Sequence, residues 1–232
     1  MIKDISLTES LQKNLPHFHP VVSFNAFREK VVALDLSKEN TNFTAEIFND
    51  LSLFTSFIND EHKASNSKFL IGGYGEVRDM YRRSTLFDTL EEPRSLHLGI
   101  DIWGPAGTQI FTPLDGMVHS FDFNNSHGDY GATIILQHQL DTFNFYVLYG
   151  HLALRDIANL RVGQLVTRGE PFAHFGSPEE NGNWPPHLHF QMILDMGIWE
   201  GDYPGVCKLS EAQKFLNNSP DPRILLNLYP TA

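Results

Sequence analysis

The chain has 232 residues and carries 17 Lys and Arg against 28 Asp and Glu, a formal net charge of −11 with its 11 histidines neutral. Hydrophobic residues make up 41% of the sequence and charged residues only 19%, a balance that supports a folded core and excludes an intrinsically disordered chain. The acidic balance argues against partners such as nucleic acid or an anionic membrane surface, because both need clustered Lys and Arg.

The first 20 residues lack the features of a secretory signal peptide, since no basic segment precedes an apolar one and no small-residue cleavage site follows. No apolar run approaches the roughly 18 residues that span a membrane. Cys207 is the only cysteine, so no intrachain disulfide can form, which favours a reducing compartment. We therefore expect a cytoplasmic protein, or an extracytoplasmic one if it is exported by another route.

Residues 1–70 are expected to form a mainly helical segment. Across residues 42–61, large apolar side chains recur at spacings of three and four, as in an amphipathic helix: Phe43, Ile47, Leu51, Phe54 and Ile58. A shorter helix is expected over residues 25–34, and residues 61–69 have the composition of a linker. The segment is interpreted either as a packing appendage or as a cap that covers a functional groove.

Residues 71–207 are expected to form a second domain with mainly antiparallel β structure. A glycine-rich and charged stretch at 71–84 predicts a loop or an irregular strand. From about residue 97, short β-favouring runs alternate with turn signals such as PLDG (113–116) and NNSHGDYG (124–131). The tail, residues 208–232, is expected to pack on the core through one short helix near 210–217, which gives an α+β fold overall.

Three short segments of the β region carry residues suited to metal chemistry. His97 and Asp101 lie four residues apart, and His187 and His189 lie two apart, so in extended strands each pair projects from one face. His151 ends an apolar strand. A catalytic zinc site needs three protein ligands and an open position. His97, Asp101 and either histidine of the second pair would supply them, which leaves two histidines to move protons.

The same three segments resemble the motifs of the M23, or lysostaphin/LytM-type, metallopeptidases. The ordered set is HLGIDI (97–102), YGHL (149–152) and HLHF (187–190), and the stretches PLDGMVHSF and LRVGQLVTRGEPFAHFGSP are similar to strands of that family. The likeness covers about residues 95–195. It implies a lysostaphin-type antiparallel β domain, of the duplicated-hybrid-motif kind, whose long groove holds an extended peptide.

Carried over residue by residue, the resemblance makes His97, Asp101 and His189 the ligands of one zinc ion. It makes His151 and His187 the catalytic pair, one as general base and the other stabilising the oxyanion, without deciding which is which. The implied activity is zinc-dependent endopeptidase cleavage of a peptide or muropeptide by water that the metal activates. A non-catalytic groove that binds a peptide or a partner is the alternative.

This chain also departs from the family pattern at the mouth of the expected groove. The loop SPEENGNWPPHLHFQ (177–191) places Trp184 where the family has small residues, and Gln191 stands where glutamate is common. Trp184 is therefore expected to line the groove, and Tyr149 is expected there as well. Tyr74 and Arg78 are expected there too, with Arg78 binding a substrate carboxylate, although a solvated charged loop is an equal interpretation. The sequence makes no prediction of oligomeric state.

Overall fold

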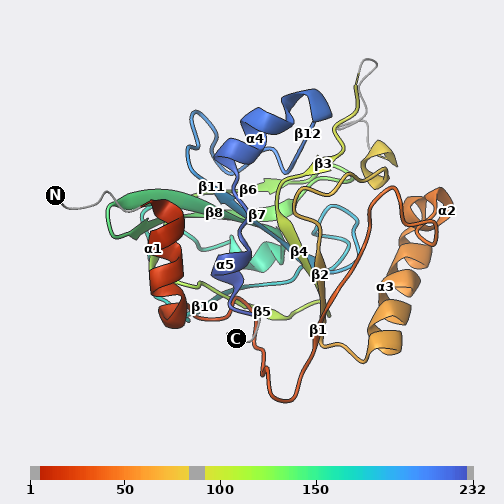
Figure 1. The fold of residues 1–232 in the computed structure, drawn as a ribbon, viewed down its shortest axis with the longest axis horizontal. Coiled ribbons are helices and arrows are strands. Elements are labelled where there is room, and N and C mark those ends of the chain that lie inside the picture. Colours follow the sequence, from red (N-terminus) through yellow and green to blue (C-terminus); the bar gives the residue numbers. More distant parts are fainter. Residues whose placement is uncertain (1–5, 84–91, 229–232) are drawn as a thin grey trace.

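An eight-stranded sheet forms the centre of the computed structural model, which describes residues 6–83 and 92–228 (Figure 1). The strand order is β1-β2-β4-β11-β8-β7-β6-β9, and every neighbouring pair is antiparallel except β1 with β2. The strands, in sheet order, are β1 (Val31–Ala33), β2 (Phe69–Gly72), β4 (Ile100–Trp103), β11 (His187–Ile193), β8 (Phe143–Leu152), β7 (Gly131–Leu140), β6 (Gly116–Asn124) and β9 (Leu165–Val166). This confirms the predicted antiparallel β domain with helices at both ends.

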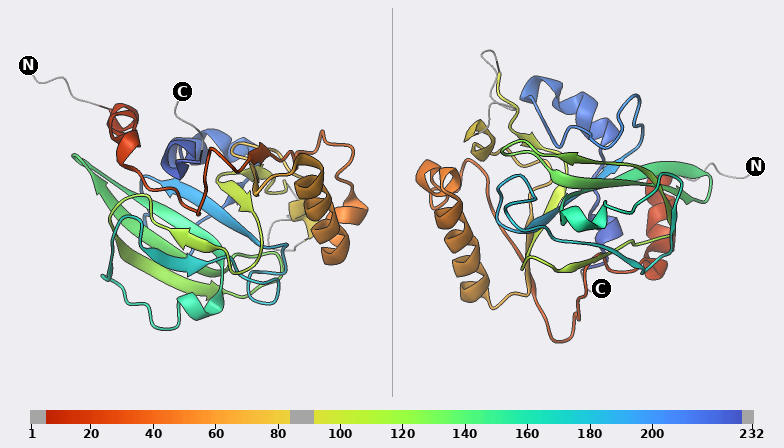
Figure 2. Two further views of the ribbon diagram at one scale, coloured as in Figure 1. Left: turned by 90° about the horizontal axis from the view of Figure 1, so that it is seen from below. Right: turned by 180° about the vertical axis from the view of Figure 1, so that it is seen from behind.

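Two small strand pairs and several helices complete the fold. β5 (Gln109–Phe111) pairs with β10 (Pro171–His174), and β3 (Leu96–His97) pairs with β12 (Val206–Cys207). The α-helices lie along one side of the large sheet (Figure 2, left): α1 (Leu7–Asn14), α2 (Ala45–Asn49), α3 (Leu51–Ser65), α4 (Ala212–Asn218) and α5 (Arg223–Leu226). Short 3-10 turns are η1 (Leu15–His17), η2 (Met80–Arg83), η3 (Leu154–Asp156) and η4 (Leu209–Glu211). Across residues 6–83 and 92–228, no helix combines the length and apolarity needed to cross a membrane.

The main core forms on one face of the central strands because their side chains alternate. In β11, Leu188, Phe190 and Met192 are fully buried and belong to the main hydrophobic cluster. Ile100 and Ile102 of β4 join them from the neighbouring strand. The alternate positions of β4 and β11 therefore project from the opposite face, where the polar residues of the sequence motifs gather.

A second, aromatic cluster joins helices α2 and α3 to the sheet. Phe54 of α3 is fully buried, and its ring centroid lies 4.9 Å from that of Phe43 and 5.5 Å from that of Trp103 on β4. Trp184 and Tyr81 belong to the same cluster. The helices therefore pack against residues of the β domain through a continuous apolar interface.

The structure corrects several predicted elements of the N-terminal segment. The helix expected over residues 25–34 is wrong: Val31–Ala33 forms strand β1, since β-branched residues favour an extended chain. The predicted helix at 42–61 is divided at Asp50, whose side chain accepts hydrogen bonds from the backbone N–H groups of Ser52 and Leu53 as the N-cap of α3. The expected linker at 61–69 instead continues α3 to Ser65 and then begins β2.

The predicted domain limits can be placed on this fold. The proposed boundary at residue 70 falls inside β2. The segment before it therefore contributes α1, α2, α3, strand β1 and the first residues of β2 to the fold. The helix expected near 210–217 corresponds to α4, and α5 follows it as a second helix of the tail. The three-part division of the chain stays a prediction.

Candidate metal centre and surrounding pocket

Strand pairing brings the three sequence motifs to one place on the sheet. In the pairing of β11 with β4, His189 lies opposite Asp101 and His187 lies opposite Trp103. On its other side, His189 lies opposite Gly150 of β8, the residue before His151. His97 reaches the same point from β3, which is followed by a short break before β4. Residues 92 positions apart in the sequence thus become direct neighbours.

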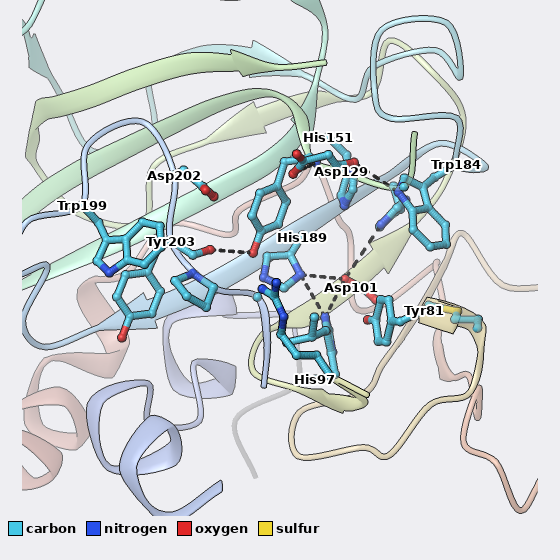
Figure 3. A pocket seen from close by; sticks show the side chains of 18 residues that line it. Tyr81, His97, Asp101, Asp129, His151, Trp184, His189, Trp199, Asp202 and Tyr203 are labelled. Atoms are coloured by element: carbon cyan, nitrogen blue, oxygen red, sulfur yellow. Dashed lines mark hydrogen bonds and ion pairs between the residues drawn. The ribbon is translucent and has the colours of Figure 1, made fainter. Parts of the chain in front are cut away.

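His97, Asp101 and His189 form a buried group whose ligand atoms face one another (Figure 3). Asp101 Oδ1 lies 3.4 Å from His97 Nε2 and 3.3 Å from His189 Nδ1, and the two nitrogens are 2.9 Å apart. Ligands bound to zinc at about 2.0–2.1 Å in a tetrahedral arrangement would lie about 3.3 Å from each other. The spacing of the group fits a small metal ion.

The hydrogen bonds of the two imidazoles decide which nitrogens carry protons. His97 Nδ1 lies 3.0 Å from the Gly73 carbonyl, which can only accept, so the proton is on Nδ1. Gln191 donates its amide N–H groups to Pro204 O and Ser219 Oγ, so its oxygen accepts from His189 Nε2 at 2.9 Å. His97 Nε2 and His189 Nδ1 are therefore both unprotonated and face a carboxylate oxygen, as metal binding requires.

Burial and neighbouring charges keep His97 and Asp101 in their metal-binding forms. Burial, reinforced by the guanidinium of Arg78, lowers the pKa of His97 to about 4, so its imidazole is neutral at pH 7. Burial alone would raise the pKa of Asp101, but His97 and Arg78 beside it hold that pKa well below its usual range. The site therefore offers the neutral imidazole of His97 and the carboxylate of Asp101.

Two further histidines, His151 and His187, stand beside the group with their ring centroids 4.1 Å apart. Each Nδ1 lies 2.8 Å from a backbone carbonyl, that of Asn181 for His151 and that of Pro185 for His187. These carbonyls fix the proton on Nδ1 and leave Nε2 able to accept one. Burial lowers the pKa of His187 to about 4, and burial together with His187 lowers that of His151 as well.

His151 also has an unusual backbone, with φ at 63° in the left-handed region. A non-glycine residue in this region carries strain and needs support from its surroundings. Its N–H donates to Tyr130 O and its carbonyl accepts from Gly176 N–H, each at 2.8 Å. The end of β8 is therefore held in the conformation that carries the imidazole beside His187.

The residues predicted to line the groove have different positions in the structure. Trp184 does line the pocket around His97, Asp101 and His189. Tyr149 is fully buried in the main core between Phe172 and Phe190, because it faces the apolar side of β8. Tyr74 donates its hydroxyl to Ser219 O. Arg78 is buried and pairs with the carboxylate of Asp101, so its observed partner is a residue of the protein and not a substrate.

Other pocket residues carry no motif that the sequence alone could reveal. Figure 3 shows Tyr81 beside Asp101, and Asp129, Trp199, Asp202 and Tyr203 across the pocket. Tyr130 completes this wall, and its hydroxyl donates to Tyr203 O at 3.2 Å. Tyr81 comes from η2 and the others come from loops, and single aromatic or acidic residues in such segments have no diagnostic spacing.

The geometry agrees with the comparison to known families. Residues 95–198 match the model of peptidase family M23. This region of the chain is an M23 domain. The match contains His97, Asp101, His151, His187 and His189. The predicted family resemblance is thereby confirmed.

The M23 domain is also similar to individual peptidases. The peptidoglycan DD-endopeptidase ShyC of Vibrio cholerae serotype O1 is 25% identical over 213 residues, which cover 84% of this chain and 44% of the relative. The chain thus spans less than half the length of that curated relative. The catalytic domain of lysostaphin from Staphylococcus simulans is 20% identical, with 74% of this chain and 96% of that domain covered and a TM-score of 0.44.

Proposed function

We propose that this chain is a zinc-dependent endopeptidase that hydrolyses an amide bond in peptidoglycan or a related peptide. The observation that carries the proposal is the buried group of His97, Asp101 and His189, with two further neutral imidazoles in the same pocket. ShyC, which matches most of this chain, is described as a peptidoglycan endopeptidase. This supports peptidoglycan as the first substrate to test.

The proposed roles follow from the donor set. His97 Nε2, Asp101 Oδ1 and His189 Nδ1 would hold the zinc ion, because all three are unprotonated and converge on one point. When bound, zinc would polarise the substrate carbonyl and lower the pKa of water. The Gly73 carbonyl and the Gln191 side chain would keep the two imidazole rings in the required orientation.

His151 and His187 would carry the proton transfers. Each presents an unprotonated Nε2 while its Nδ1 is held by a carbonyl, so either can accept the proton of the attacking water. The histidine that accepts this proton would become an imidazolium whose Nε2–H can donate to the oxyanion, whereas the other histidine could do so only with its own Nε2 protonated. His187 is further fixed by stacking on Trp103, with ring centroids 4.0 Å apart.

The test is to incubate the zinc-loaded protein with purified muropeptides and with a general peptide library, and to identify products by mass spectrometry. We expect cleavage that a chelator abolishes and zinc restores. His151→Ala and His187→Ala should each lose at least about a hundredfold in kcat, the usual worth of a general base, while zinc content is kept. His17→Ala, at an exposed position outside the pocket, is the matched control.

The non-catalytic alternative gives a different pattern. The wild-type protein would bind muropeptides without turnover, and His151→Ala would leave that binding unchanged. If the re-metallated wild-type protein contained no zinc or similar ion, the proposed function would be rejected.

A further inference from the structure

Arg78 is a buried cation at the edge of the metal centre. Only 1% of its surface is exposed, and its Nη1 donates to Asp101 Oδ2 at 2.6 Å and to Tyr81 Oη at 3.1 Å. Its Nε donates to Glu76 Oε2 at 2.5 Å. A buried guanidinium with two carboxylate partners is rigid, because leaving either charge unpaired in the interior would be costly.

The guanidinium of Arg78 lies in a space that exists because residue 73 is glycine. A Cβ atom at Gly73 would lie 1.9 Å from Nη2 of Arg78, and the φ of 104° at Gly73 is one that other residues rarely adopt. The carbonyl of the same glycine accepts from Nδ1 of His97. The loop from residue 73 to residue 78 thus contacts two of the three proposed ligands.

Backbone hydrogen bonds hold this loop against strand β3. Gly75 N–H donates to His97 O, His97 N–H donates to Glu76 O, and Arg78 N–H donates to Ser95 O, each at 2.9 Å. Glu76 Oε1 also accepts from Leu36 N–H at 3.3 Å, which ties the loop to the N-terminal segment. Arg78 therefore approaches Asp101 from a backbone that is itself fixed.

The consequence for Asp101 is that its two oxygens have separate roles. Oδ2 accepts from Arg78, whereas Oδ1 faces His97 Nε2 and His189 Nδ1. Glu76 is the second carboxylate partner of Arg78. Besides the charge that acts on the pKa of Asp101, Arg78 contributes the direction of its hydrogen bond to Oδ2.

We infer that Arg78 is the positioning residue of the metal centre, which fixes the carboxylate of Asp101 so that one oxygen is presented to zinc. This inference rests on the proposed zinc site. Removing a hydrogen-bond partner that orients a metal ligand typically weakens metal affinity by about 10- to 100-fold. We expect a loss in that range for Arg78→Gln, and a smaller loss for Arg78→Lys, which keeps the charge without the planar fork.

The experiment measures zinc affinity of the metal-free protein by competition with a chromophoric chelator, together with the visible spectrum of the cobalt-substituted protein. Arg28→Gln removes an exposed arginine and is the matched control. Arg78→Gln should weaken zinc binding and change the cobalt spectrum, and Glu76→Gln should weaken binding to a lesser extent. Arg28→Gln should leave both readouts unchanged.

Thermal midpoints of the metal-free proteins separate positioning from a general loss of folding. If Arg78→Gln does not fold, zinc affinity and the cobalt spectrum are measured on Arg78→Lys and Glu76→Gln instead. A folded Arg78 variant with wild-type zinc affinity and a wild-type cobalt spectrum would overturn the inference while leaving the proposed zinc site intact. Failure of the wild-type protein to bind zinc would overturn both.

Discussion

Replacing Phe54 with alanine tests whether the N-terminal helices are an integral part of the folded M23 domain. Phe54 is fully buried, and its ring contacts Phe43 within the helical segment and Trp103 and Trp184 on the β-domain side, with centroid distances of 4.9, 5.5 and 6.4 Å. Phe-to-Ala changes in a packed core cost about 3–5 kcal/mol, through lost burial and the cavity that remains. In a chain of this size each kcal/mol lowers the thermal midpoint by about 2–4 °C.

We therefore expect Phe54→Ala to lower the unfolding free energy by about 3–5 kcal/mol and the thermal midpoint by roughly 6–20 °C. Urea unfolding followed by far-UV circular dichroism and by tryptophan fluorescence should give one shared transition, since Trp103 and Trp184 belong to this interface. Leu53→Ala, at the adjacent and 42% exposed position of α3, is the control and should cost under about 1 kcal/mol. A loss below about 1 kcal/mol for Phe54→Ala, or helical signal that melts separately from fluorescence, would refute the reasoning.

Three further predictions concern other buried positions. Burial lowers the pKa of His138 to about 4, below its value of about 6.5 in the unfolded chain. The folded state therefore loses stability as the pH falls from 6.5 toward 4. In His138→Gln, the slope of the unfolding free energy against pH should be smaller by up to about 1.4 kcal/mol per pH unit. Urea titrations between pH 4 and pH 6.5 measure this slope. A Cβ atom at Gly99 would lie 2.6 Å from the His189 ring. Gly99→Ala should therefore weaken zinc binding at least about tenfold, as measured by competition with a chelator. Unchanged zinc affinity would contradict the position assigned to the His189 ring. Burial raises the pKa of Cys207 to about 11, so a chromogenic disulfide reagent should label it only after denaturation, and rapid labelling of the native protein would contradict its buried placement.

The sequence by itself predicted the β architecture, which the structure confirms, and it named the residues of the proposed site. Alternation of apolar and polar residues in HLHFQMI predicts a strand with Leu188 and Phe190 in the core and both histidines on the other face, and β11 has this arrangement. The reason is local: the two-residue period of a strand fixes which side chains share a face. The amphipathic pattern likewise located most of α3.

Tertiary structure decided everything that depends on long-range pairing. The register that places His189 opposite Asp101, and the loop that brings Arg78 to the same carboxylate, join segments separated by many residues. The sequence offered Arg78 either a substrate carboxylate or solvent as its partner, since a charged loop has no periodicity from which contacts can be predicted. The local pattern predicts a helix that includes residues 31–33. These residues form a strand instead, because their pairing with β2 outweighs that weak pattern. Side-chain types and strand periodicity are local properties, whereas which groups are buried together is a property of the assembled fold.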